Sequence, residues 1–220
     1  MKFDMHMHSI YSKHKIIGLD SYSKPEDIVK TAISRGLDGV AVTDHNCVKG
    51  SLETKKAARK IGKNFIVITA SEIRTPNGDV LAYGIQEDIN GKIGFMETID
   101  KIRQQGGIAV VAHPFTKAFG FLTKTRWQVD DLKHFDGIEV FNAGVRKGNQ
   151  TALEVAKKFG KGMSAGSDAH TLRAIGYAGI ECENPLKDIK SGNVKIWGRN
   201  KSVPVILENY FMKGYKVLGL

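Results

Sequence analysis

Short apolar segments rich in β-branched residues alternate with amphipathic segments along this chain. The apolar runs are typical of buried strands, and a period of about 3.6 residues is typical of helices. This alternation predicts the α/β class, with a parallel sheet that is either doubly wound or closed into a barrel. The expected strands are Lys2–His8, Gly39–Thr43, Phe65–Ser71, Asp79–Ile85, Ile108–Ala112, Gly137–Phe141, Met163–Gly166 and Tyr177–Glu181. The expected helices are Lys24–Arg35, Gly50–Ile61, Gly94–Gln105, Gly148–Phe159 and Val203–Met212.

The first expected helix carries the clearest terminal signals. Ser23 and Glu26 have the spacing of a capping box, in which each side chain binds a free backbone donor of the other residue. Pro25 falls in the first turn, where its missing N–H group costs nothing. Gly36 follows the last turn and suits the C-cap. These signals set the limits of the helix.

Histidines and acids gather at the C-terminal ends of the expected strands. In (β/α) barrels the catalytic groups occupy this end of the sheet. A doubly wound sheet would place its site at one switch point, often with a glycine-rich phosphate loop, which this sequence lacks. The barrel is therefore the better prediction. The residues at strand ends are His8, Asp44, His45, Glu72, His113, Asp168 and His170.

The first expected strand contains two histidines separated by one residue. Because side chains alternate between the faces of a strand, His6 and His8 point the same way, with Asp4 behind them. Their Cα atoms lie about 7 Å apart, so both imidazoles can reach one metal ion. The alternative is a pair of core histidines with satisfied hydrogen bonds. The apolar strand around them favours the metal site.

Two further motifs supply a histidine and two acids. His45 follows the second expected strand as a plausible ligand, and Asp44 before it either orients a histidine or belongs to a turn. Glu72 follows the third expected strand and would face the barrel mouth, where a carboxylate can bridge two cations. Taken alone, Glu72 is better explained as a solvated loop acid.

The remaining strand-end motifs are Ala-His-Pro around His113 and Asp-Ala-His at Asp168–His170. Asp168 and His170 repeat the spacing of the two histidines in the first strand. Each motif taken singly is equally well explained by a loop or a cap. Together, neutral imidazoles and hard carboxylates suit Zn, Mn or Fe. His134 lies in a polar stretch with no strand before it, and we expect it on the surface.

These motifs, in this order, resemble those of the PHP (polymerase and histidinol phosphatase) family. The resemblance implies a distorted (β/α)7 TIM-like barrel, formed here by residues 1–220 as a single domain. It also implies phosphoester hydrolysis with two or three divalent metal ions. The matching segments are Asp4–Ser9, Thr43–Asn46, Ser71–Ile73, Ala112–Pro114 and Gly166–His170.

The resemblance also implies three groups of metal ligands. The first metal would be held by His6, His8, Glu72 and Asp168, the second by His45 and His170, and the third by His113 with the shared Glu72. Two positions depart from the commonest pattern of the family. His14 stands near a position where many members carry an Asp, and it either binds the second metal or is a loop histidine. Asp79 stands where many members have a His, and it either supplies an oxygen to the third metal or marks a weaker third site.

The implied chemistry needs a nucleophile and neutralisation of charge on oxygen. A water that bridges two cations loses its proton easily, because one zinc ion alone lowers the pKa of water to about 7. The hydroxide would attack phosphorus in line, with Asp168 or Asp44 managing protons. Arg173 is the best candidate for a phosphate clamp, since a guanidinium binds phosphate through two parallel hydrogen bonds.

Four other polar residues are weaker candidates for a role at the site. Arg146 and Lys117 lie in other strand-end loops and are better explained as surface charges. Glu139 and Asn142 also end a strand, and they either support the site or reflect ordinary strand-end polarity.

Composition limits the possible partners. The net charge of +10 is compatible with anionic ligands, but the lysines are dispersed and no aromatic stacking platform accompanies them. We therefore expect a small phosphorylated substrate; nucleic acid stays possible but is not favoured, and the oligomeric state is open. No apolar run approaches the roughly 20 residues of a membrane span. Cys47 and Cys182 suggest reduced thiols in a cytoplasmic protein.

Several functions are consistent with this sequence. A phosphatase for a small monoester comes first, and a nuclease using the same chemistry on short nucleic acid comes second. A non-catalytic metal-binding domain would be favoured by the loss of several ligands, and nearly all are present. An amidohydrolase-type reaction is the fourth, since the same metals activate water against carbonyls.

Overall fold

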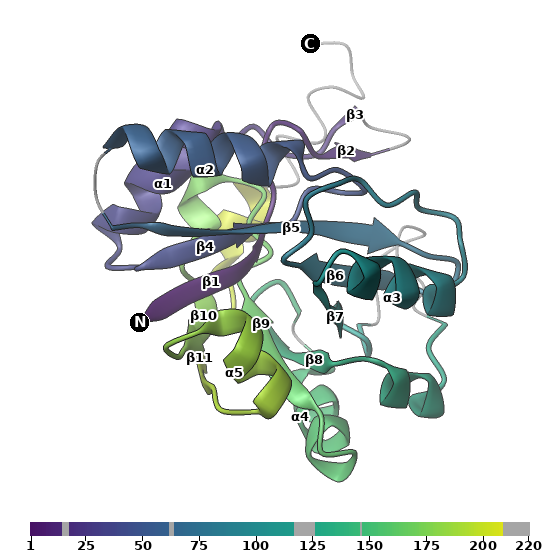
Figure 1. Ribbon diagram of the computed structural model, residues 1–220. Helices are drawn as coiled ribbons and strands as arrows, with labels where there is room; N and C mark the ends of the chain where they lie inside the picture. The colour runs from purple at the N-terminus through teal and green to yellow at the C-terminus, as the bar shows by residue number, and fades with distance from the viewer. Residues whose placement is uncertain (15–17, 62–63, 117–125, 146, 209–220) are drawn as a thin grey trace.

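A computed structural model describes residues 1–14, 18–61, 64–116, 126–145 and 147–208 (Figure 1). For residues 14, 18 and 19 it describes only the backbone. Among the described residues, no helix combines the length and the apolar character needed to cross a membrane.

One mixed sheet of nine strands organises the described chain, in the order β11-β10-β1-β4-β5-β6-β7-β8-β9. A small separate sheet pairs β2 with β3. The strands are β1 (Lys2–Met7), β2 (Lys13–His14), β3 (Gly18–Leu19), β4 (Gly39–Val42), β5 (Ile66–Arg74), β6 (Asp79–Tyr83), β7 (Ile108–Val111), β8 (Gly137–Asn142), β9 (Gly162–Gly166), β10 (Ala178–Glu181) and β11 (Lys195–Gly198).

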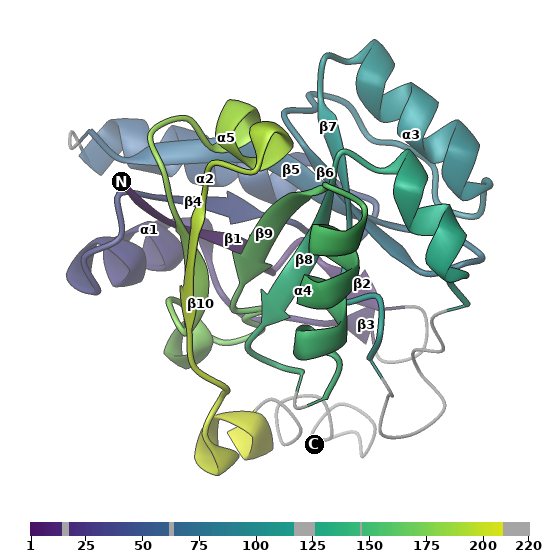
Figure 2. The ribbon, with the colours of Figure 1, turned by 90° about the horizontal axis from the view of Figure 1, so that it is seen from below.

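The sheet curls until its last parallel strand returns to its first, which gives a nearly closed barrel. Figure 2 shows β9 beside β1. The closing contacts come from the residues just after β9: the backbone N–H of Asp168 donates to His6 O at 2.7 Å. The N–H of His8 donates in turn to Ala169 O at 2.8 Å. The predicted distorted barrel is confirmed, and its closure brings the ends of β1 and β9 together.

The expectation of an all-parallel sheet is wrong at two places. β6 runs antiparallel to both β5 and β7, and β10 runs antiparallel to both β1 and β11. Only residues 75–78 separate β5 from β6, and a parallel crossover needs a dozen residues or more. The short connection therefore imposes a hairpin.

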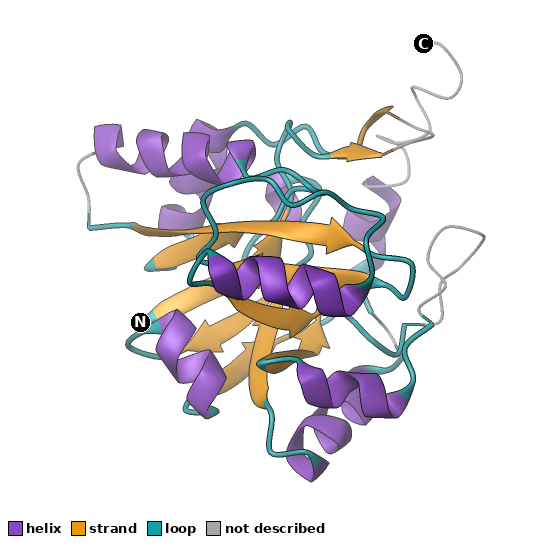
Figure 3. Cartoon of the chain, turned by 45° about the vertical axis from the view of Figure 1, so that its right-hand side comes forward, coloured by secondary structure: helices purple, strands orange, loops and turns teal. Residues whose placement is uncertain are grey.

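The helices cover the outside of the sheet, as Figure 3 shows. They are α1 (Pro25–Ser34), α2 (Lys49–Ile61), α3 (Phe95–Gln104), α4 (Asn149–Lys158) and α5 (Pro185–Ser191), with 3-10 turns η1 (Val129–His134) and η2 (Leu172–Ala174). Residues 203–208 are also helical, and the rest of the helix expected at 203–212 lies outside the described residues. The sequence reading missed α5, η1, η2, β2, β3 and β11. All are short, and α5 is defined mainly by its ends, where Asn184 caps Lys187 N.

The expected capping box of α1 is wrong. The N-cap is Lys24, no side chain caps this end, and the Ser23 hydroxyl has no hydrogen-bond partner among the described residues. The backbone of Ser23 instead accepts from Ile10 N at 3.0 Å, because this segment packs against the loop after β1. Pro25 does occupy the first turn. The C-cap is Arg35, and Gly36 directly after it adopts the left-handed φ of +72° that is typical of this position.

Two strand irregularities aim side chains into the barrel. β1 has a register shift against β4 between Asp4 and Met7, and β8 has one against β9. A bulge interrupts the two-residue alternation of a strand. Met5 consequently packs with Tyr83 in the interior cluster, while the adjacent His6 also faces inward toward Glu72. The interior of the barrel is therefore apolar, and the polar side chains lie at the C-terminal ends of its parallel strands, which we call the mouth of the barrel.

Candidate metal centre

A single buried carboxylate, that of Glu72, lies among four histidines. Its Oε2 is 3.5 Å from Nε2 of His6, 3.4 Å from Nε2 of His8 and 3.0 Å from Nδ1 of His45. Its Oε1 is 3.2 Å from Nε2 of His113. His6 lies in β1, and the other three histidines follow the ends of β1, β4 and β7, so the barrel gathers parts of the chain more than 100 residues apart.

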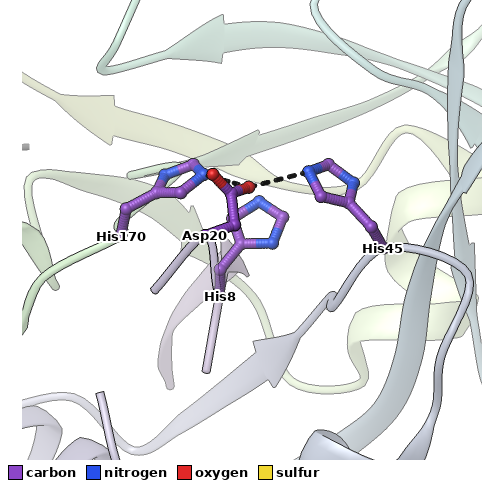
Figure 4. A group of neighbouring side chains, drawn as sticks. All are labelled: His8, Asp20, His45 and His170. Carbon is purple, nitrogen blue, oxygen red and sulfur yellow. Dashed lines mark hydrogen bonds and ion pairs between the residues drawn. The ribbon is translucent and has the colours of Figure 1, made fainter. Parts of the chain in front are cut away.

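Asp20 joins the cluster although the sequence reading did not select it. Its Oδ2 lies 3.1 Å from Nε2 of His45 and 3.1 Å from Nε2 of His170 (Figure 4). His8 completes this group, whose ligand atoms all lie within 4.8 Å of one another. Asp20 follows β3 rather than a strand of the barrel, so the strand-end rule does not select it. The backbone of His14 lies in β2, and its side chain is outside the described part of the structure.

Asp79 opens β6 on the other side of Glu72. Asp79, Glu72 and His113 form a third group with ligand atoms within 4.8 Å of one another. Burial raises the pKa of Asp79, and the nearby Glu72 charge raises it further. A cation held here would relieve this repulsion between the two carboxylates.

Asp168 closes the cluster from the end of β9. Its Oδ1 is 3.3 Å from Nε2 of His8, 3.6 Å from Nε2 of His6 and 3.5 Å from Nδ1 of His170. Asp168 has φ +51°, a backbone conformation that residues other than glycine seldom adopt. The buried ammonium group of Lys201 donates to Asp168 O at 2.6 Å and so holds this conformation.

Glu139 supports the histidines from behind. Its Oε1 is 2.9 Å from Nδ1 of His6, and its Oε2 accepts from the backbone N–H of His113 at 2.9 Å. Asn142 donates its amide group to the same oxygen at 3.1 Å. A carboxylate on the outer nitrogen of a histidine fixes the ring so that the other nitrogen points inward. The supporting role that the sequence left open for Glu139 is therefore visible in these contacts.

The side chains of two predicted catalytic residues contact groups outside the cluster. The Asp44 carboxylate accepts from the backbone N–H of Ser9 at 2.6 Å and from its hydroxyl at 2.5 Å. It therefore holds the loop after His8 and orients no histidine among the described residues. Arg173 is exposed, with Nη1 3.9 Å from Oε2 of Glu208.

The remaining residues singled out in the sequence fall into three groups: exposed, outside the described residues, or part of the cluster. His134 is exposed, as expected. Arg146 and Lys117 lie outside the described residues. The structure brings together His6, His8, His45, Glu72, Asp79, His113, Asp168 and His170, and adds Asp20.

Charge pairing shifts the pKa values of the clustered side chains. Burial alone would lower the pKa of His6, but Glu139, Glu72 and Asp168 together raise it well above its usual value. Burial also lowers the pKa values of His45 and His113. The negative charge of Glu72 and its hydrogen bonds outweigh burial and raise each pKa to about 9.

His8 behaves differently from these three histidines. Burial, with the neighbouring charge of His170, lowers the pKa of His8 to about 3. A neutral imidazole is the form that binds metal. The metal-free cluster is therefore a network of charged and neutral imidazoles around buried carboxylates.

The arrangement fits divalent metal ions. Nε2 of His6 and Nε2 of His8 are buried and form no hydrogen bond among the described residues, although both face Glu72 and Asp168. Ligands about 2 Å from a tetrahedral ion lie roughly 3.3 Å from one another. The separations of 3.3 to 3.6 Å between these nitrogens and the carboxylate oxygens match that spacing.

Known proteins share both the sequence pattern and the fold. A family model described as the PHP domain matches residues 4–161, and one described as PHP-associated matches residues 146–191. The uncharacterized protein MJ1587 of Methanocaldococcus jannaschii is 38% identical over 159 residues, which cover 70% of this chain and 90% of that protein.

Two solved structures share the fold at 17% identity. One is a two-domain protein from Bacteroides vulgatus described as containing a predicted PHP-like metal-dependent phosphoesterase, with a TM-score of 0.70 over 97% of this chain and 69% of that one. The other is Endonuclease Q bound to a 27-mer duplex with an abasic lesion, with a TM-score of 0.62 over 91% of this chain and 60% of that one. With its barrel, its strand-end motifs and the match over residues 4–161, the chain belongs to the PHP domain family.

Proposed function

We propose that this protein is a metal-dependent phosphoesterase that hydrolyses a small phosphomonoester at a site of two or three divalent ions, Zn, Mn or Fe. The observation that carries the proposal is the buried Glu72 carboxylate among four histidines, beside imidazole nitrogens that lack hydrogen-bond partners among the described residues. The family and the fold of the PHP-like neighbours support the same chemistry.

Three overlapping groups of side chains would hold the ions. The first is His6, His8, Glu72 and Asp168; the second is His45, His170 and Asp20; and the third is His113, Asp79 and the shared Glu72. Asp20 joins the second group, for which the family resemblance also offered His14. Shared carboxylates are typical of sites with adjacent cations.

Bound ions would activate water as a nucleophile at neutral pH and neutralise charge on the phosphoryl oxygens. The protein supplies orientation and a path for protons. Glu139 and Ser12 fix the outer nitrogens of His6 and His8, with contacts of 2.9 and 3.2 Å. Asp168, whose side chain is 21% exposed at the mouth, would accept a proton. Asp44 acts by holding Ser9 and the loop that follows His8.

The proposal is tested with purified protein loaded with Mn or Zn and a generic aryl phosphate. We expect hydrolysis, and we expect His6→Ala or Asp168→Ala to lower it by at least about 1000-fold, since each removes a metal ligand. His134→Ala is the matched control, because this histidine is exposed and outside the cluster. A metal-replete protein inert towards a broad panel of phosphomonoesters and oligonucleotides would refute the assignment.

The second candidate is a nuclease, which the net charge of +10 permits and which Endonuclease Q, a protein of the same fold, brings into consideration. Oligonucleotides would then compete strongly with the aryl phosphate. Their apparent affinity would also fall steeply with salt, because each phosphate contact releases counterions. Weak competition with a shallow salt dependence supports the small substrate.

A further inference from the structure

β5 extends past the metal centre and ends in an arginine. Side chains two residues apart share one face of a strand, so Arg74 lies on the same face as Glu72, with its Cα about 7 Å further along. The pairing of β5 with β6 is regular here, and it sets Arg74 directly opposite Asp79. Arg74 therefore stands at the rim of the third group of ligands.

The backbone of Arg74 is anchored on both sides. Its N–H donates to Oδ1 of Asn46 at 2.9 Å, and its carbonyl accepts from Lys92 N at 3.1 Å. Asn46 has a strained backbone with φ +51°, and such strain persists where surrounding contacts hold the residue in place. The arginine is thus fixed in place although it lies beyond the barrel proper.

In the described part of the structure, no carboxylate directly contacts the guanidinium group of Arg74. The residue is half-buried, and its side chain forms no ion pair and no hydrogen bond within the described residues. Its position opposite Asp79 in the pairing of β5 with β6 nevertheless sets it beside the cluster. By contrast, Arg103 and Arg173 each have a carboxylate within 4.0 Å.

We propose that Arg74 binds the phosphoryl group of the substrate at the edge of the metal centre. This inference rests on the proposed function and assigns the anion-binding side chain of the same site. A guanidinium presents parallel N–H donors that match two phosphoryl oxygens. With the acids of the cluster committed to cations, the unpaired charge of Arg74 stays available for an anion. Arg173, which the sequence favoured for this task, faces Glu208 instead.

The test measures binding of inorganic phosphate to the metal-loaded protein by titration calorimetry. Loss of a charge-assisted contact worth about 1.5–3 kcal/mol weakens binding by roughly 10- to 100-fold, which we expect for Arg74→Met. Arg74→Lys should recover part of the affinity, because it keeps the charge and loses the paired donors. With the aryl phosphate, KM should rise more than kcat falls.

Arg59→Met is the matched control, since Arg59 is exposed on α2 and its loss changes the net charge equally. It should leave phosphate affinity unchanged, and metal content should stay constant in all variants. Unchanged phosphate affinity in Arg74→Met, or weakening accompanied by loss of metal, would overturn the inference. Phosphate binding that depends on Arg74 in a protein inert towards every ester would uphold the inference and refute the hydrolase.

Discussion

Strained residues surround the mouth of the barrel. His113 has φ +27°, and Asn46 and Asp168 both have φ +51°. Such conformations cost of order 1–3 kcal/mol each and persist only where surrounding contacts hold them. Glu139 holds the backbone of His113, and Lys201 holds that of Asp168. His113 and Asp168 are proposed metal ligands, and Asn46 directly follows a third, His45.

Asp20 gives the sharpest prediction at the scale of single residues. Asp20→Asn replaces the carboxylate between His45 and His170 with a weaker neutral ligand. We expect the metal content, measured by elemental analysis, to fall by about one ion per chain, with activity reduced by roughly 100-fold. Asp130→Asn is the control, because Asp130 is 81% exposed and pairs only with Lys133 among the described residues. Full metal content in Asp20→Asn would contradict this role.

At the scale of elements, connection length explains only some of the strand pairings. A helix between two strands predicted parallel neighbours correctly at β1–β4, β4–β5 and β8–β9. The same rule failed at β6–β7 and β10–β11, which are antiparallel although α3 and α5 lie between them. The four-residue turn before β6 forced a hairpin, and the bulge in β1 changed which residues face inward. Short elements such as α5 and β11 carry too little periodicity to be seen.

The contact between β9 and β1 is testable at Gly166. A Cβ atom added there would lie 2.3 Å from Cβ of His6 and 2.5 Å from its backbone nitrogen. Gly166→Ala should therefore lower the free energy of unfolding by about 3 kcal/mol, measured by urea denaturation. Gly94→Ala, with nothing within 4 Å of the added atom, should cost less than about 1 kcal/mol. Equal costs for the two variants would show that the barrel does not close tightly here.

For the whole molecule, the metal centre is a buried concentration of charge inside an apolar fold. Its carboxylates are compensated either by protonated histidines or by metal ions. In the metal-free protein the protonated histidines compensate Glu72. Burial alone would raise the pKa of Glu72, but the neighbouring His6 and His45 hold it well below its usual value, so the carboxylate stays ionised. The stability of the fold is therefore linked to both pH and metal.

We expect the metal-free protein to lose stability as pH rises from about 6.5 to about 9. Burial opposes the charge on His45 and His113, but Glu72 raises their pKa values from 6.5 to about 9, so protonation favours the folded state throughout this interval. His8, whose pKa burial lowers to about 3, is neutral above 6.5 in both states and does not contribute. The loss of stability is measured as the thermal unfolding midpoint at several pH values, with a chelator present to keep the protein metal-free.

Metal-loaded protein provides the comparison. The imidazoles that bind metal are already neutral. The thermal unfolding midpoint of the metal-loaded protein should therefore be higher than that of the metal-free protein and should change little between pH 6.5 and 9. A metal-free protein whose midpoint is flat from pH 6.5 to 9 would contradict the charge network.

The sequence by itself determined the class of fold, the order of the strand-end motifs and the family. These follow from local periodicity and from residue types that repeat at strand ends. Only the tertiary structure showed that Asp20 approaches His45 and His170 and that Asp44 binds Ser9. It alone also showed that Arg74 lies opposite Asp79, whereas Arg173 faces Glu208. Those facts depend on bulges, turns and barrel closure, which arise from packing between distant segments and leave no periodic signal in the chain.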